Sequence, residues 1–387
     1  MAKKKTETTQ TIETDNPFED FLKSTSIKDL DLATTLDQSK LSNISEWIST
    51  GSYSMNKVLS GSYYKGIPRG RIIAIAGPSG VGKSYISGCC IREAQKVGYD
   101  CVVFDSENAI DKDFLGRIGV DVGKVLHVPV NTVSEVKLKG IKMMREYHEK
   151  YPNRKLFIVL DSLGGLMTDK EFYTDIEANK NASDMGLRAK ELRVLAKALT
   201  HEVAKCGAAM VVTNHTYEKP NPYNPSLPPT TTMGGGEGFV YATSGVLLLK
   251  KKKDNEKENG ANVIKGVILI GTTEKNRFVP QGAKGEIYLS FEKGVNKWYG
   301  LFEDAKEFGY IKQSGAWYEF VDDEGNQIAK VNGEKNLYKS QNWKPIISFI
   351  NTKVEEKFKF ADYIDEDELD AEIDGIEEEF TEESSDN

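Results

Sequence analysis

One eight-residue segment limits the possible folds of this chain more than any other. Residues 77–84 read GPSGVGKS, follow the short apolar run Arg71–Ala76 and precede a helix predicted to start near Gly82. This is the G-x-x-x-x-G-K-[ST] pattern in the strand–loop–helix setting of a phosphate-binding loop. The glycines let backbone N–H groups approach phosphate oxygens, and the helix N-terminus adds favourable partial charge. We expect ATP phosphates to bind Gly77, Pro78, Ser79, Gly80, Val81, Gly82, Lys83 and Ser84.

A magnesium site is predicted from the same loop and from a second strand. Lys83 can reach the β- and γ-phosphates, and the hydroxyl of Ser84 can bind Mg²⁺. Asp161 ends the apolar run at 156–161, where such sites place their second Mg²⁺-binding carboxylate, acting through water. An aspartate that simply caps the next helix is the alternative interpretation.

Hydrolysis of a nucleotide also needs a group that activates or orients water. Glu107 follows the strand predicted to end at Asp105, beside the phosphate-loop strand. A carboxylate there could face the γ-phosphate. On chemistry alone, Asp105 and Asp111 are equally good candidates.

The rest of the chain alternates strand-like and helix-like segments. Near-continuous apolar strands separated by helices indicate an α/β fold, with a mostly parallel twisted sheet flanked by helices. After residue 298 the composition becomes aromatic and charged, which predicts a small C-terminal α+β domain. The predicted strands are Tyr99–Asp105, Leu156–Asp161, Ala208–Asn214, Gly245–Lys250 and Val263–Thr272, and the predicted helices are Val133–Lys150 and Asp184–Lys205.

The charge of the chain is unevenly distributed. Its net charge is −8, but residues 361–387 contain 14 acidic residues and no Lys or Arg. The body is therefore mildly basic, which suits a polyanionic partner such as DNA. The acidic tail either competes with DNA for this basic surface or is a disordered, solubilising segment, and charge alone favours neither.

Several other classes of protein do not fit the composition. No apolar run approaches the roughly 18–20 residues that span a membrane, and the polar N-terminus is unlike a secretory signal. The four cysteines lack metal or disulfide spacing, which indicates buried thiols in a reducing cytoplasm. We expect an N-terminal arm over residues 1–45 that docks on a neighbouring protomer or on its own core, a core over 46–298, the small domain over 299–360, and the tail.

Two polar connections are longer than ordinary loops, which seldom exceed about 12–15 residues. Residues 168–183 contain aromatic side chains, and residues 216–238 contain prolines and three consecutive glycines. Both leave the predicted sheet at carboxyl ends of strands, on the side of the phosphate loop. We expect two DNA-binding loops, although composition suits a surface loop without a ligand equally well. Candidate contacts are Lys170, Phe172, Tyr173 and Lys180 in the first loop, and Lys219, Thr232, Met233, Gly234, Gly235 and Gly236 in the second.

Together these segments resemble the RecA family of recombinases, and within it the UvsX recombinases of T-even-like phages. The resemblance covers residues 46–345. It implies a RecA-type P-loop ATPase core with a small C-terminal domain. The matching segments are the approach at 49–52 and 66–72, the phosphate loop, Phe104–Glu107, Val159–Ser162, Thr213–Glu218 with Met233–Gly236, Glu274–Arg277 and Gly315–Tyr318.

The resemblance also implies roles for individual residues. Glu107 would activate the attacking water, and Phe114 would stack on adenine. His215 would sense the γ-phosphate and pass its state to the second loop, although a lone histidine is more often structural. The bacterial relatives have glutamine at this position, and the phage relatives have histidine. Lys275 and Arg277 would enter the ATP site of the adjacent protomer, where Arg277 replaces a lysine with a cation of different geometry.

The activity implied is ATP-dependent DNA strand exchange. ATP between protomers would favour an extended filament that holds single-stranded DNA by its backbone, without sequence preference. Expected partners are single-stranded DNA, homologous duplex DNA, further copies of the chain, and mediator and single-strand-binding proteins. Two other classes stay open, a hexameric RecA-fold DNA helicase and a non-catalytic DNA-binding accessory protein. The glycine-rich loop argues against the helicase, and the complete set Lys83, Ser84, Glu107 and Asp161 argues against the accessory protein.

Overall fold

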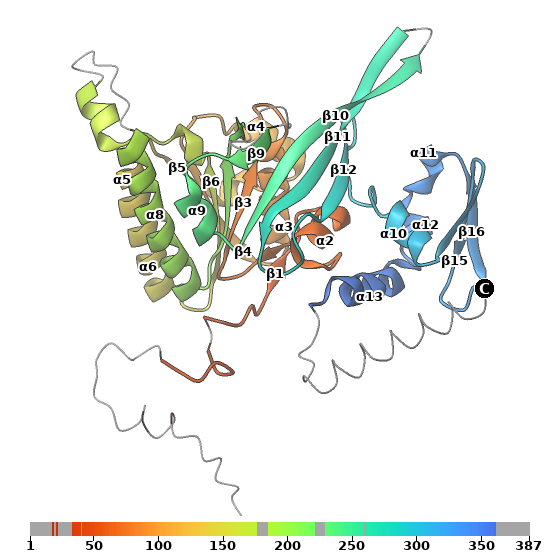
Figure 1. The fold of residues 1–387 in the computed structure, drawn as a ribbon, viewed down its shortest axis with the longest axis horizontal. Coiled ribbons are helices and arrows are strands. Elements are labelled where there is room, and N and C mark those ends of the chain that lie inside the picture. Colours follow the sequence, from red (N-terminus) through yellow and green to blue (C-terminus); the bar gives the residue numbers. More distant parts are fainter. Residues whose placement is uncertain are drawn as a thin grey trace, which may run out of the picture.

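The computed structural model describes Phe18, Phe21 and residues 33–39, 41–175, 185–220, 229–258 and 261–360. Lys180, most of the arm predicted at 1–45 and the tail at 361–387 lie outside the described residues. The described chain forms a large α/β part built on one wide sheet, with a smaller C-terminal part beside it (Figure 1).

Nine strands of the described chain form the central sheet, in the order β13-β12-β11-β10-β3-β7-β6-β4-β5. All pairings from β10 across to β5 are parallel, whereas β10 to β13 pair antiparallel at the other edge. The predicted mostly parallel sheet is therefore confirmed. The strands are β3 (Ile72–Ala76), β4 (Tyr99–Asp105), β5 (Val125–Pro129), β6 (Lys155–Asp161), β7 (Ala209–Asn214), β10 (Gly245–Glu258), β11 (Ala261–Asn276), β12 (Lys284–Ser290) and β13 (Gly294–Asn296).

Helices cover both faces of this sheet (Figure 1). Alternate residues of β3 face opposite sides, so Ile73 and Ile75 pack in one apolar cluster while Ile72 and Ala74 pack in the other. Because both clusters are buried, β3, β4, β6 and β7 have no polar face, which is why they read as continuous apolar runs. The first cluster includes α3 (Lys83–Lys96) and α4 (Lys112–Ile118), and the second includes α5 (Val133–Glu135), α6 (Ile141–Lys150), α8 (Met185–Lys205) and α9 (Glu237–Ala242).

The helix predicted over Val133–Lys150 is helical throughout but changes its winding. A π-helical turn, η3 (Val136–Gly140), separates α5 from α6. The predicted capping box is present: the backbone N–H of Glu135 donates to Oγ1 of Thr132 at 3.1 Å, and its carboxylate accepts from the backbone of Thr132. Shorter elements are β1 (Trp47–Ile48), which pairs with β2 (Ile67–Pro68), and α2 (Tyr53–Ser60), η2 (Val122–Lys124) and η4 (Leu163–Gly165).

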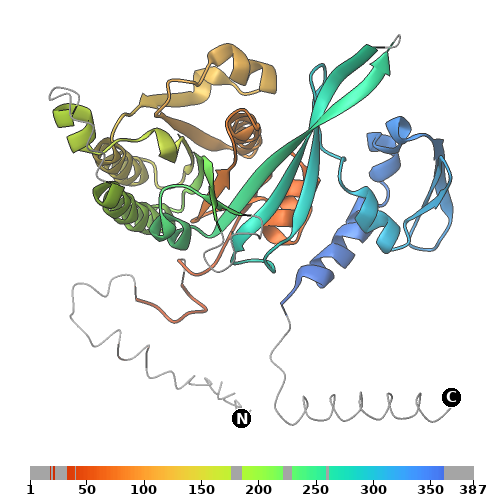
Figure 2. The same ribbon diagram turned by 45° about the horizontal axis from the view of Figure 1, so that its top comes forward.

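The strands β10 and β11 are longer than predicted. They pair along their whole length and extend beyond the parallel strands as a two-stranded ribbon (Figures 1 and 2). The sequence predicts strands only over Gly245–Lys250 and Val263–Thr272 because apolar residues stop there. Beyond that point β10 continues through the exposed lysines 250–253. Backbone pairing with β11, and not burial of side chains on β10, therefore extends this strand.

The C-terminal part has its own apolar core. It lies beside the ribbon, and its three strands form an antiparallel sheet (Figure 2). Its core includes Trp343, Phe320 and Ile350, together with Tyr63 from the large part. The elements are α10 (Phe302–Glu307), β14 (Ile311–Ser314), β15 (Trp317–Val321), β16 (Gln327–Asn332), α11 (Glu334–Leu337), α12 (Ser340–Trp343) and α13 (Ile347–Phe358).

A buried ion pair joins the two parts. The ammonium of Lys57, on α2, lies 2.7 Å from Oδ2 of Asp304, on α10. The hydroxyl of Tyr63 donates to the same oxygen at 2.6 Å. Burial, and then the charge of Asp304, hold the pKa of Tyr63 well above its ordinary value. Tyr63 therefore keeps its proton at neutral pH and donates it to the carboxylate of Asp304 inside the protein.

All four cysteines are free thiols, as predicted. Burial raises the pKa of Cys89 to about 11, so this thiol is unreactive at neutral pH. No helix within the described ranges is both long and apolar enough to cross a lipid bilayer.

Candidate functional site

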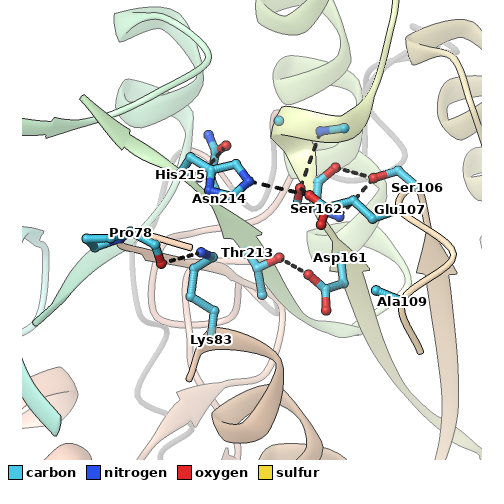
Figure 3. A network of polar contacts seen from close by, with 12 residues as sticks. Pro78, Lys83, Ser106, Glu107, Ala109, Asp161, Ser162, Thr213, Asn214 and His215 are labelled. Carbon is cyan, nitrogen blue, oxygen red and sulfur yellow. Dashed lines mark hydrogen bonds and ion pairs between the residues drawn. The ribbon is translucent and has the colours of Figure 1, made fainter. Parts of the chain in front are cut away.

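The carboxyl ends of the parallel strands bring the candidate residues to one edge of the sheet. In the strand register, Ala76 lies opposite Asn214, and Asp105 lies opposite Asp161. The segments that follow β3, β4, β6 and β7 therefore leave the sheet side by side. They contain the phosphate loop, Glu107, Ser162 and His215 (Figure 3).

The phosphate loop has the backbone that its sequence predicts. Gly80 and Gly82 have φ of +65° and +109°, a conformation that favours glycine. At Gly77 a Cβ atom would lie 2.8 Å from the carbonyl oxygen of Leu249, so the neighbouring strand leaves no room for a side chain. Helix α3 begins at Lys83, directly after the loop. The loop amides and the helix N-terminus thus form the cradle that an anion requires.

The side chain of Lys83 bends back over the loop. Its ammonium donates to the carbonyl oxygens of Gly77 at 2.9 Å and Pro78 at 3.0 Å. Burial lowers the pKa of Lys83, while the carboxylates of Asp161 and Glu107 act in the opposite direction. A nearby phosphate would offset this cost of burying the charge, because an anion favours the protonated amine.

Asp161 presents one carboxylate oxygen without a partner. Its Oδ1 accepts a hydrogen bond from the hydroxyl of Thr213, on the neighbouring strand (Figure 3). Its Oδ2 is buried and has no hydrogen-bond partner among the residues that the structure describes. A buried, unpaired carboxylate oxygen needs a cation or water, so this residue fits the predicted magnesium site. The described residues contain no cluster of three or more His, Cys, Asp or Glu side chains suited to a metal.

Glu107 lies between two other strand ends. One of its carboxylate oxygens accepts a hydrogen bond from the hydroxyl of Ser162 and lies 3.5 Å from Nε2 of His215 (Figure 3). Its side chain is 41% exposed, so substrate and water can reach it. The geometry therefore places Glu107 at the sheet edge that carries the phosphate loop, where it is accessible and is contacted by Ser162 and His215.

Asp105 serves a different purpose, which the sequence alone did not reveal. Its carboxylate is 1% exposed and accepts from the backbone N–H groups of Glu107, Ala109 and Ile110 at 3.1–3.3 Å. It also lies 3.1 Å from Nε2 of His127. Its oxygens are thus occupied in holding the segment that presents Glu107. The third candidate, Asp111, caps α4 through the backbone N–H of Asp113.

Asn214 connects the phosphate loop to the glycine-rich segment. Its backbone carbonyl accepts from Gly77 at 3.1 Å, and its side-chain amide donates to the carbonyl of Gly234 at 2.8 Å. Gly234 donates in turn to the carbonyl of His215 at 2.9 Å. The segment that follows β7 is therefore bonded both to the loop and to Gly234. Sequence reasoning missed Asn214, although its place at a strand end before His215 was a usable signal.

The second candidate DNA loop is more ordered than predicted. Instead of a structureless connection over 216–238, its ends form a hairpin of β8 (Thr216–Lys219) and β9 (Thr230–Met233), followed by α9. The β-branched threonines of β9 favour this extended pairing. Gly234–Gly236 connect the hairpin to α9. A surface pocket of about 430 Å³ lies against the hairpin, these glycines and α9. It is lined in part by Tyr217, Lys219, Thr232, Met233 and Gly235.

The first candidate loop, predicted over 168–183, also begins as a helical turn. Thr168 and Glu171 exchange side-chain-to-backbone hydrogen bonds of 2.8 and 3.1 Å, which start the turn η5 (Lys170–Asp175). Within it, the rings of Phe172 and Tyr173 make an edge-to-face contact with centroids 4.9 Å apart. Tyr173 is exposed and therefore available to a ligand.

Phe114, the predicted adenine contact, is half-buried on α4. Its ring lies edge-on to Tyr85 of α3, with centroids 6.0 Å apart. Tyr85 lies in the first turn of α3, which begins directly after the phosphate loop. The two rings therefore lie near this loop, which is compatible with a base bound next to the phosphates.

Lys275 and Arg277 lie at the other end of the sheet. In the register, Lys275 is opposite Val246, and the adjacent Gly245 is opposite Ile73, at the start of β3. The phosphate loop follows the far end of β3, so these cations are remote from the loop of their own chain. The ammonium of Lys275 donates at 2.7–2.9 Å to the carbonyls of Val240, Tyr241 and Thr243 at the end of α9.

The environment of Lys275 predicts a pH dependence. Burial, and then Arg277, lower the pKa of Lys275 to about 8. Between the lowered pKa of about 8 and the ordinary lysine pKa of about 10.4, this side chain binds fewer protons in the folded state than in the unfolded state. The free energy of unfolding therefore rises with pH over this range. We expect the wild type to gain stability relative to Lys275→Met between pH 7.5 and 9.5, measured by urea unfolding.

A control variant isolates this effect. Lys252→Met removes an exposed lysine of the ribbon, and the difference between this variant and the wild type should stay constant over the same range. A constant difference for Lys275→Met would contradict the assigned cause.

Comparison with known proteins agrees with this geometry. The family model described as the RecA N-terminal domain matches residues 31–296. The "Recombination and repair protein" of Enterobacteria phage T4 is 30% identical over 306 residues, covering 77% of this chain and 74% of the relative. "Protein RecA" of Thermotoga neapolitana is 27% identical over 76% of this chain and 79% of the relative. "Protein RecA" of Bacteroides thetaiotaomicron is 30% identical over 74% and 82%. The chain therefore belongs to the RecA family.

Proposed function

We propose that this chain is an ATP-dependent DNA recombinase that polymerises on single-stranded DNA and catalyses homologous pairing and strand exchange. The observation that supports this most is the convergence at one sheet edge of the phosphate loop, Glu107 and the segment that leads to the glycine-rich hairpin. The relatives are named as RecA and as a recombination and repair protein. These names do not favour the hexameric helicase or the non-catalytic accessory protein.

The nucleotide chemistry is assigned to residues of this edge. Backbone N–H groups of Gly77 and residues 79–82 bind the β-phosphate, and Lys83 turns from the carbonyls of Gly77 and Pro78 to the β- and γ-phosphates. Ser84 and Asp161 hold Mg²⁺, which neutralises charge on the phosphates. Phe114 contacts the adenine.

Hydrolysis is assigned to Glu107. A water oxygen attacks the γ-phosphorus while the bond to the β–γ bridging oxygen breaks, and the carboxylate of Glu107 accepts the proton that water loses. Ser162 and His215, which contact that carboxylate, orient it. His215 senses the γ-phosphate, and the hydrogen bond that its backbone carbonyl accepts from Gly234 passes the change to the hairpin.

DNA binding is assigned to the two segments beside this edge. Single-stranded DNA lies against η5 and the β8–β9 hairpin, with Lys170 and Lys219 near its phosphates and Phe172 and Tyr173 beside its bases. Backbone N–H groups of residues 232–236 bind further phosphates. Because these contacts are not specific to sequence, pairing with the incoming duplex selects the homologous partner.

Self-association follows from the placement of Lys275 and Arg277. They lie at the end of β3 opposite the phosphate loop, so they suit the nucleotide of an adjacent protomer in a head-to-tail arrangement. Such an arrangement repeats into a helical filament when its rotation does not close a ring. The proposed place of action is the cytoplasm, with mediator and single-strand-binding proteins as further partners.

One experiment tests the proposal as a whole. Purified protein is mixed with circular single-stranded DNA, ATP and Mg²⁺, imaged by electron microscopy, and then given homologous linear duplex. We expect helical filaments, and joint molecules that require both ATP and homology. A heterologous duplex is the control. Unwinding of duplex by discrete rings, or DNA binding with no ATP turnover, would overturn the proposal in favour of one of the two alternatives.

A further inference from the structure

The base of the ribbon lies directly against the phosphate loop. Leu249 and Lys251 are two residues apart on β10, so their side chains share one face of the ribbon. Leu269, on β11, is the register partner of Lys251 and lies on the same face. Pairing is regular from Leu247 to Asp254, so no bulge disturbs this alternation.

Three glycines of the loop meet this face. A Cβ atom at Gly77 would lie 2.8 Å from the carbonyl oxygen of Leu249, and one at Gly82 would lie 3.2 Å from Cδ1 of Leu269. Between them, the ammonium of Lys251 donates to the carbonyl oxygen of Gly80 at 2.7 Å. The ribbon therefore contacts the loop at its start, its middle and its end.

The lysine at the middle of this contact is exposed. Among the side chains that the structure describes, no carboxylate forms an ion pair with Lys251. Its neighbours Lys250 and Lys252 are also exposed, but the alternation of the strand directs them to the opposite face. Lys251 alone of these three thus combines a positive charge with a contact to the loop.

We propose that Lys251 is a positioning residue of the nucleotide site, which fixes the phosphate loop at Gly80 in its phosphate-binding shape. This inference rests on the proposed binding of ATP. The hydrogen bond to the Gly80 carbonyl holds that peptide against the ribbon. The free loop then samples fewer conformations, so nucleotide binding costs less conformational entropy. The charge of Lys251 also adds to the positive field in which the phosphates bind.

The inference is tested by nucleotide affinity without DNA. We expect Lys251→Met to weaken binding of a fluorescent ATP analogue by about tenfold, in line with loss of one charge-assisted hydrogen bond. Because Lys251 acts through the loop, the corresponding ADP analogue should weaken by the same factor. Lys251→Arg, which keeps the donor and the charge, should restore most of the affinity. The midpoint of thermal unfolding without nucleotide should be unchanged in all variants.

A matched variant separates position from charge. Lys252→Met removes the same charge from the other face of the ribbon, and we expect its affinity to stay within about twofold of the wild type. Wild-type affinity in Lys251→Met, or equal weakening in Lys252→Met, would overturn the inference while leaving ATP binding in place. A loss confined to the ATP analogue would overturn it too, since it would indicate a direct γ-phosphate contact. Failure of the wild type to bind either nucleotide would instead overturn the proposed function as well.

Discussion

Replacement of Lys83 by alanine is expected to abolish ATP turnover and joint-molecule formation. The change removes the loop cation that we propose to bind the β- and γ-phosphates, and it leaves the carbonyls of Gly77 and Pro78 without their donor. Loss of a positioned charge at a transferring phosphoryl group lowers turnover by at least about 10²-fold. Phosphate release and a gel assay for joint molecules measure the two effects.

The control for this variant is Lys142→Ala. Lys142 is exposed on α6 and makes only a surface ion pair with Glu146, so both activities should stay at the wild-type level. Strand exchange at the wild-type rate in Lys83→Ala would refute the assigned role of the lysine.

Replacement of Glu107 by glutamine is expected to separate binding from hydrolysis. Glutamine keeps the size of the side chain and an oxygen that can accept from Ser162, but it cannot take a proton from water. Loss of a general base lowers turnover by about 10²–10⁴-fold. ATP binding and ATP-dependent filaments on single-stranded DNA should persist, and become longer-lived because the nucleotide is not consumed.

Two measurements check this result. Single-turnover phosphate release reports the chemical step, and filament lifetime is followed by fluorescence of labelled single-stranded DNA after excess competitor is added. Glu149→Gln, an exposed change on α6, should leave both unchanged. Turnover within a few-fold of the wild type in Glu107→Gln would move the water-activating role to another group.

Local sequence was sufficient for the phosphate loop but not for the carboxylate that serves it. The loop over 77–84 is specified by glycines and one lysine within eight residues, so its conformation can be predicted from local sequence alone. Asp105 and Glu107 are chemically alike and two residues apart. Their chemistry does not distinguish them, and the sequence points to Glu107 only through the family resemblance. The fold separates them physically, because it buries Asp105 against three backbone amides and leaves Glu107 open toward Ser162 and His215.

The hairpin in the glycine-rich segment and the ribbon were missed for a related reason. The hairpin strands Thr216–Lys219 and Thr230–Met233, and residues 251–258 of β10, are mostly polar and show no apolar alternation, although the opposite strand of the ribbon was predicted over Val263–Thr272. Apolar periodicity reports which side chains are buried. It therefore does not predict strands that lie in solvent and are held mainly by backbone hydrogen bonds. The parallel strands β3, β4, β6 and β7 were predicted closely because they are buried on both faces, whereas the parallel edge strand β5, which is largely exposed, was missed.

The buried contact between Lys57 and Asp304 has a consequence for how copies of this chain can rearrange. Rotation of the C-terminal part away from the large part would leave one or both charges unpaired in a poorly solvated environment, which costs free energy. The two parts should therefore travel as one rigid body when nucleotide is bound or lost. Changes in the length of the proposed filament would then come from tilting of whole subunits against one another.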